Sequence, residues 1–123
     1  MKRVLIVDDD EDFREALGSA LGRAGFGIEH ASDGKVAMRV LKEGRGVPCA
    51  MLIDLMMPNM DGWELIDTLK EDPALARIPS AVVSAAQDKR NLPKSVVTFP
   101  KPCDLSEVIR FLRTACPDQH APA

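Results

Sequence analysis

The chain has 123 residues, which is enough for one domain with a single hydrophobic core but too few for two ordinary domains. Its composition, with 46% hydrophobic and 28% charged residues, is typical of a globular protein. The net charge of −3 argues against non-specific nucleic-acid binding, and no stretch approaches the roughly 18 apolar residues that span a bilayer. We therefore expect neither direct nucleic-acid binding nor membrane insertion.

The cysteines and histidines argue against a disulfide scaffold and against a zinc site. Cys49, Cys103 and Cys116 form no Cys-x-x-Cys pair and cannot all pair with one another, a pattern that favours a reducing compartment. His30 and His120 lie far apart in the chain, so no zinc site is predicted. The apolar run at the amino terminus is too short for a signal peptide. We expect a cytoplasmic protein.

Short continuous apolar runs alternate with helical periodicity from one end of the chain to the other. Runs without polar alternation predict strands that are covered on both faces, as in parallel sheets. Apolar residues at i, i+3, i+4 and i+7 predict helices between them. In chain order, the predicted elements are a strand at residues 4–7, a helix over 13–24, a weaker strand at 27–31, a helix over 36–41, a strand at 51–53, a helix over 65–69, strands at 81–83 and 96–97, and a helix over 105–115.

This alternation predicts an α/β fold with a doubly wound parallel sheet. The third helix is expected to end at the Asp72–Pro73 pair, and the last to begin at Asp104 with Glu107 at capping-box spacing. Only about ten residues join the fourth strand to the fifth, so we expect a shortened or irregular fourth helix there. Residues 117–123 lack periodicity and are expected to form a disordered tail.

Candidate functional residues lie where the predicted strands end. In an open α/β sheet, ligands bind beyond the carboxyl ends of the strands, so side chains that follow different strands meet along one edge. The residues at these ends are Asp8, Asp9 and Asp10 after the first strand, Asp54 after the third, Ser84 after the fourth and Lys101 after the fifth.

These residues would form a carboxylate cluster with one hydroxyl and one ammonium group. Crowded carboxylates repel one another, and Mg²⁺ relieves this because it takes oxygen ligands and is typically held by one or two carboxylates plus phosphate oxygens. A lysine and a serine can contact phosphoryl oxygens, and a carboxylate can be the nucleophile. The set predicts Mg²⁺-dependent phosphoryl transfer. Taken singly, residues 8–12 could be an acidic helix start and Lys101 a surface lysine.

Four motifs give the chain a close resemblance to the receiver domain of bacterial two-component response regulators. They are VLIVDDD near the amino terminus, LIDLMMPNMDG in the middle, VVSAA after the fourth strand and KP at Lys101–Pro102. The resemblance implies one receiver domain over residues 1–116 with a flavodoxin-like, five-stranded parallel sheet in the order 2-1-3-4-5. It also implies a sensor histidine kinase or a phosphotransfer protein as phosphodonor, and a further protein as downstream partner.

The resemblance implies a role for each residue of the cluster. Asp10 is not expected to be a direct metal ligand, and the Lys101–Pro102 peptide bond is expected to be cis. The implied assignments are Asp54 as phosphoacceptor, Asp8 (through a water), Asp9, Asp54 and the backbone carbonyl of Met56 as Mg²⁺ ligands, and Ser84 and Lys101 as contacts of the phosphoryl group.

Three departures from the family pattern fall on the side that usually transmits the signal. Thr98 stands three residues before Lys101, where the family often has an aromatic residue, and Phe99 should point to the opposite face. Cys103 replaces a usual phenylalanine, and the fourth crossover is short. The residues for phosphorylation are all present, so this chemistry is predicted to be intact. The usual transmission of the signal from the hydroxyl residue to an aromatic residue of the fifth strand is not predicted.

Several interpretations of function follow from these residues. The preferred one is a single-domain response regulator that is phosphorylated on Asp54 and acts through protein–protein contact. The alternatives are a degenerate receiver that docks constitutively and a receiver fragment of a longer regulator. An aspartyl-phosphate phosphohydrolase would need an acid where Met56 stands, and a flavodoxin-like cofactor binder would need a phosphate-binding loop after the first strand.

Overall fold

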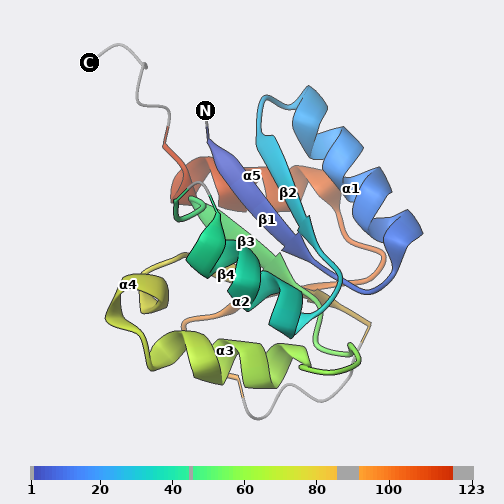
Figure 1. Cartoon of the computed structure of the whole chain (residues 1–123). Helices are drawn as coiled ribbons and strands as arrows, with labels where there is room; N and C mark the ends of the chain where they lie inside the picture. Colours follow the sequence, from blue (N-terminus) through green and yellow to red (C-terminus); the bar gives the residue numbers. More distant parts are fainter. Residues whose placement is uncertain (1, 45, 86–91, 118–123) are drawn as a thin grey trace.

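Five strands pair into one parallel sheet in the order β2-β1-β3-β4-β5 (Figure 1). The computed structural model describes residues 2–44, 46–85 and 92–117. Every neighbouring pair of strands is parallel, which confirms the predicted fold class and strand order. The strands are β1 (Arg3–Val7), β2 (Gly27–Ala31), β3 (Ala50–Ile53), β4 (Ser80–Ser84) and β5 (Val97–Pro100).

Helices cover both faces of the sheet (Figure 1). Buried residues of α1 and α5 pack on one face, and those of α2 and α3 pack on the other. Within the described ranges no helix is long and apolar enough to cross a membrane. The helices are α1 (Glu11–Arg23), α2 (Gly34–Glu43), α3 (Gly62–Lys70), α4 (Pro73–Ala76) and α5 (Leu105–Ala115).

Burial explains why the central strands are continuous apolar runs. Alternate residues of β1 enter the two cores: Leu5 and Val7 lie in the core beneath α2 and α3, and Val4 and Ile6 in the core beneath α1 and α5. All residues of β3 and most of β1 and β4 are buried. β2 lies at the edge of the sheet and is mostly half-exposed, which is why its sequence signal is weak.

Aspartates at the N-cap position start all five helices of the described chain. Asp72 caps the four-residue helix α4, whose first residue is Pro73, so this pair begins a helix as well as following one. The capping box predicted at Asp104 is wrong, because its carboxylate accepts from the Ser106 N–H at 3.0 Å. The box lies instead at the start of α3. The N-caps are Asp10, Asp33, Asp61, Asp72 and Asp104.

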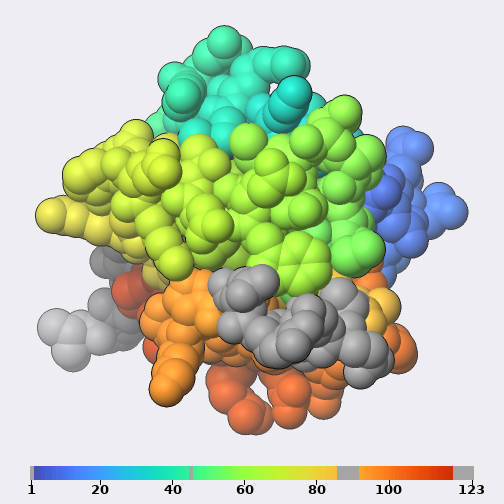
Figure 2. Space-filling model, turned by 90° about the horizontal axis from the view of Figure 1, so that it is seen from below, coloured from blue at the N-terminus to red at the C-terminus, as the bar shows by residue number. Residues whose placement is uncertain are grey.

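The connection from β4 to β5 is only partly described. Residue 85 and residues 92–96 contain no helix, and the rest of the predicted short crossover lies outside the described residues. Leu92 and Val96 pack against the core beneath α2 and α3. Figure 2 shows α3 crossing the middle of this face, with α2 on one side and the segment leading into β5 on the other. The predicted tail falls mostly on residues 118–123, which also lie outside the described part.

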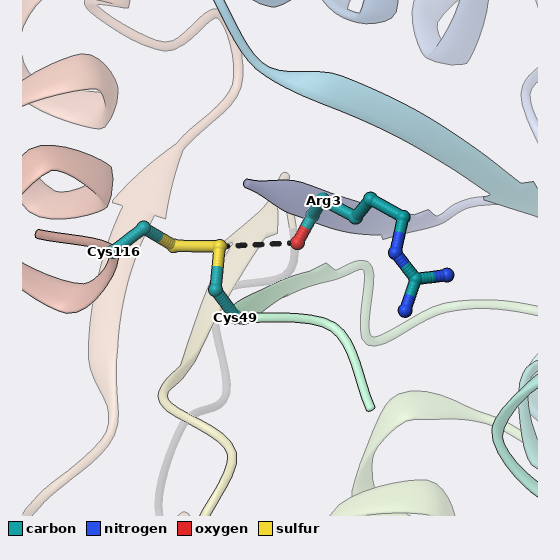
Figure 3. Close-up of a disulfide and its surroundings, with 3 residues drawn as sticks. All are labelled: Arg3, Cys49 and Cys116. Atoms are coloured by element: carbon teal, nitrogen blue, oxygen red, sulfur yellow. Dashed lines mark hydrogen bonds between the residues drawn. A yellow bond between two sulfur atoms is a disulfide. The ribbon is translucent and has the colours of Figure 1, made fainter. Parts of the chain in front are cut away.

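A disulfide joins Cys49, just before β3, to Cys116, the C-cap residue of α5 (Figure 3). The sequence pattern argued against a disulfide scaffold and did not predict this bridge, while Cys103 is free. The Cys49 N–H donates to the Arg3 carbonyl oxygen at 2.9 Å. The Cys49 Sγ lies 3.1 Å from the same oxygen, a close contact rather than a hydrogen bond, since a disulfide sulfur carries no hydrogen. The bridge lies at the amino ends of β1 and β3.

Candidate functional site

The backbone hydrogen bonds of the sheet continue into the two residues that carry the buried carboxylates of the site. Asp8 follows β1, and its N–H donates to the Ala31 carbonyl at 3.0 Å. Asp54 follows β3, and its N–H donates to the Val7 carbonyl at 2.9 Å. The two aspartates are only 2% and 6% exposed. The sheet itself therefore fixes both carboxylates at its carboxyl edge.

Asp9 completes an acidic cluster with these two residues. One carboxylate oxygen from each of Asp8, Asp9 and Asp54 lies within 4.8 Å of the others, and Asp9 is exposed to solvent. Asp10 is used differently: its side chain accepts from the Phe13 N–H at 3.0 Å and caps α1. The structure thus brings together three of the four acids predicted to converge and assigns the fourth to the helix start.

Lys101 supplies the positive charge of the site. Its Nζ lies 2.7 Å from Asp8 Oδ2 and 3.5 Å from Asp54 Oδ2. Its backbone N–H donates to the carbonyl of Ser84 at 3.3 Å, and Ser84 is buried at the end of β4. The Lys101–Pro102 peptide bond is cis, as predicted. All four predicted strand ends therefore meet at one edge.

Burial and mutual repulsion set the protonation behaviour of the cluster. Burial raises the pKa of Asp8 above its ordinary value, and the Asp54 charge adds to the rise, while hydrogen bonds from Lys101 and from the Asp10 N–H oppose it. Burial alone would lower the pKa of Lys101, but the carboxylates of Asp8 and Asp54 outweigh it, so that this pKa is raised. The ammonium stays charged and leaves the cluster with an excess of carboxylates.

This donor set fits a hard divalent cation. Three carboxylates converge, two of them on the rigid ends of buried strands, and a single ammonium cannot balance them. Carboxylate oxygens are the ligands that Mg²⁺ prefers. Met56 is 61% exposed, while its N–H lies 3.4 Å from Asp54 Oδ1. The thioether is therefore not part of the buried cluster.

The loop after Asp54 is tied to the start of α2, a feature that the sequence pattern did not predict. Asn59 adopts a φ of 67° and donates from Nδ2 to Asp33 Oδ2 at 2.8 Å. The Gly34 N–H donates to the Met60 carbonyl at 3.0 Å. A Cβ at Gly34 would come within 2.8 Å of that carbonyl oxygen, so the two loops touch without room for a side chain. The turn-forming residues of the two loops were the only sequence signal near this contact, and they do not indicate that the loops touch.

Two residues of α1 also reach the site and were missed from sequence. Arg14 donates from Nη1 to the Asp8 carbonyl oxygen at 2.7 Å. The ring of Phe13 lies under the Lys101 ammonium, 4.2 Å from Nζ to the ring centroid. Helical periodicity assigned Phe13 to the core, and nothing in the sequence linked it to a residue near the other end of the chain.

Phe99, the aromatic residue of β5, points to the face of the sheet that α1 and α5 cover. Phe99 pairs in register with Val83 of β4 and lies in the core beneath α1 and α5. Its ring meets that of Phe111 edge to face, with centroids 6.1 Å apart. Thr98 pairs with Val82, which lies in the opposite core. The prediction that Phe99 points away from the face of Thr98 is confirmed.

The fold and the site define a flavodoxin-like α/β protein with an acidic cluster and a lysine at the carboxyl edge of its sheet. The family model of the response regulator receiver domain matches residues 4–111. The chain therefore belongs to the receiver domain family of two-component response regulators.

Relatives and solved structures agree with this assignment. Response regulator MprA of Mycolicibacterium vanbaalenii is 32% identical, over 97% of this chain and 54% of that protein. An uncharacterized 14.6 kDa protein of Leptolyngbya boryana is also 32% identical, over 92% of this chain and 88% of its own length. The chain thus spans about half the length of the MprA regulators it matches.

The solved structures of greatest use for comparison are receiver domains. The receiver domain of a signal transduction histidine kinase from Syntrophus aciditrophicus has a TM-score of 0.84 at 26% identity, over all of this chain and 96% of that one. A response regulator receiver protein from Pseudomonas putida has a TM-score of 0.83 at 28% identity, over 91% and 95% of the two chains. Both likenesses extend over nearly the whole fold.

Proposed function

We propose that this chain is a single-domain response regulator that accepts a phosphoryl group on Asp54. The observation that supports this most is the surroundings of that carboxylate. It is buried, shares an oxygen cluster with Asp8 and Asp9, and lies 3.5 Å from the Lys101 ammonium. Phosphorylation of Asp54 would explain why acidic residues that can hold a cation and a lysine that can contact phosphoryl oxygens surround this carboxylate.

The proposed reaction transfers the group from a phosphohistidine of a sensor kinase or a phosphotransfer protein. A carboxylate oxygen of Asp54 attacks phosphorus, the phosphorus–nitrogen bond breaks, and an acyl phosphate forms. Asp8, Asp9, Asp54 and the Met56 carbonyl would hold Mg²⁺, which supplies charge neutralisation for the phosphoryl oxygens. Lys101 and the Ser84 hydroxyl would contact those oxygens. The chain acts as phosphoacceptor and promotes its own modification, rather than converting an external substrate.

The proposed output is contact with another protein. Residues 1–116 would act as one receiver domain, with no direct contact to nucleic acid, in the cytoplasm. The phosphoryl group would bias an equilibrium between two arrangements of the strand ends, because Lys101 and Ser84 interact with it in only one of them.

Phosphorylation by a small donor tests the site directly. The protein is incubated with acetyl phosphate and Mg²⁺, and its intact mass is recorded. We expect the wild type to gain one phosphoryl group and Asp54→Ala to gain none. Asp12→Ala is the matched control, since Asp12 belongs to the same acidic region but is exposed in the first turn of α1. Equal labelling of Asp54→Ala and wild type would refute the assignment.

A constitutive docking module is the second candidate. It is favoured by the burial of Phe99 against Phe111, because the aromatic side chain of β5 then lies away from the surface that usually responds. In that case Asp54→Ala and wild type would bind a partner with equal affinity, with and without phosphodonor. A phosphorylation-dependent affinity would exclude it. A receiver segment of a longer regulator would share the same site chemistry.

A further inference from the structure

The Lys101 ammonium contacts an aromatic ring as well as two carboxylates. Nζ lies 4.2 Å from the centroid of the Phe13 ring, inside the distance of about 6 Å at which a cation is attracted to a ring face. Phe13 is half-buried in the first turn of α1 and packs against the core beneath α1 and α5. The contact is therefore partly shielded from water, which strengthens it.

The ring is held in place by a closed circuit of contacts. Asp8 Oδ1 accepts from the Asp10 N–H at 2.9 Å, and Asp10 Oδ1 accepts from the Phe13 N–H at 3.0 Å. The Phe13 ring contacts Lys101, and Lys101 donates back to Asp8 Oδ2 at 2.7 Å. The same aspartate that binds the ammonium therefore also orients, through Asp10, the turn that carries the ring.

The proposed function makes two of the three partners of this ammonium unavailable. Asp8 is a ligand of the proposed cation site, and a lysine bound to it competes with the cation for the same carboxylate. The carboxylate of Asp54 is the group that becomes modified. The lysine has a flexible four-carbon side chain that costs about 2 kcal/mol of rotamer entropy to order. Phe13 is the remaining contact that neither event removes.

We propose that Phe13 is a positioning residue of the phosphoacceptor site, whose ring face keeps the Lys101 ammonium beside Asp54 when Asp8 is occupied by a cation. This inference rests on the proposed function. A ring suits the task better than another carboxylate would. It attracts the ammonium through its quadrupole but carries no net charge, so that it neither binds the metal ion nor cancels the charge offered to the phosphoryl oxygens.

Three variants separate the ring face from simple packing. Phe13→Leu keeps apolar volume without a π-face, and Phe13→Tyr keeps the face. Phe111→Leu is the matched control, because Phe111 packs against the same core but contacts the Phe99 ring. The first measurement is the rate of phosphorylation by acetyl phosphate at saturating Mg²⁺. Phe13→Leu should lower the rate about fivefold, or about 1 kcal/mol, whereas Phe13→Tyr should stay within about twofold of wild type.

The second measurement needs neither metal nor phosphodonor. The ε-methylene resonances of Lys101 are followed by NMR in lysine-labelled protein and assigned with Lys101→Met. If the ammonium lies over the ring face, the ε-methylene protons of Lys101 should show upfield ring-current shifts. These shifts should vanish in Phe13→Leu and persist in Phe13→Tyr and Phe111→Leu. Equal rates for leucine and tyrosine at position 13, or ring-current shifts unaffected by Phe13→Leu, would overturn the proposal. If wild type is not phosphorylated at all, the proposed function fails, while the NMR result still tests the contact.

Discussion

Reduction of the Cys49–Cys116 disulfide is expected to destabilise the fold by about 4 kcal/mol. The bridge spans a sequence separation of 67 residues, and closing a loop of that length in the unfolded chain removes roughly this much entropy at 25 °C in the chain-entropy model. For a domain of this size the loss corresponds to a fall in the melting temperature of about 15 °C. The folded structure keeps its other contacts, so the effect acts through the unfolded state.

The assay compares one protein in two redox states. Non-reduced protein and protein treated with a phosphine reductant are melted under otherwise identical conditions, and thiols are counted after denaturation. The oxidised form should expose one thiol, that of Cys103, and the reduced form three. Cys103→Ser is the matched control, because it removes a cysteine outside the bridge and should retain the full redox difference in melting temperature.

Two results would refute this reasoning. One is a count of three thiols in protein purified without reductant, which would mean that the bridge does not form there. The other is a bridged protein whose melting temperature changes by less than about 3 °C on reduction. Phosphorylation by acetyl phosphate well below the melting temperature should be unchanged by reduction, because the bridge lies at the amino ends of β1 and β3 and Asp54 follows the opposite end.

Three further predictions concern the loops around the site. Lys101→Met should tighten Mg²⁺ binding at least about fivefold by calorimetry, because it removes a cation 2.7 Å from Asp8 Oδ2; an unchanged affinity would contradict the proposed competition. Asn59→Gly, which suits the φ of 67°, should cost about 2 kcal/mol in urea unfolding at pH 7. The Asn59 hydrogen bond is the main cause that lowers the pKa of Asp33 below 3.8, so this cost should shrink as the pH falls below that value; a pH-independent cost would contradict it. Gly62→Ala should lower the melting temperature, since its Cβ would overlap the backbone carbonyl at the end of β3, and an unaltered melting curve would count against this contact.

The fold was predictable because its central strands are buried on both faces. β3 is buried throughout, so its sequence has no polar alternation, and the same property identified β1 and β4. The helix α4, which lies between α3 and β4, was missed because four residues are too few for a periodic signal. Asp72 and Pro73 are nevertheless typical N-cap and first-turn residues. Local pattern therefore identified the buried strands and the longer helices and failed for the shortest helix.

The candidate site was predictable only in part, for a topological reason. Parallel strands deliver their carboxyl ends to one edge, so Asp8, Asp54 and Lys101 could be brought together from strand positions alone. The Asn59–Asp33 hydrogen bond, the Phe13–Lys101 contact and the disulfide join segments whose proximity depends on side-chain packing. No spacing rule predicts such contacts.

The alternation of β5 explains the departure from the aromatic position of the family. Successive strand residues point to opposite faces, so an aromatic residue at 99 cannot replace one at 98 without turning the strand over. Phe99 is fixed instead by its register with Val83 and by its edge-to-face contact with Phe111 of α5. Two residues later the same segment reaches Lys101, whose N–H is bound to the Ser84 carbonyl. The ends of β4 and β5 therefore connect the site to α5 through Phe99, and on the opposite face β5 presents the small side chain of Thr98.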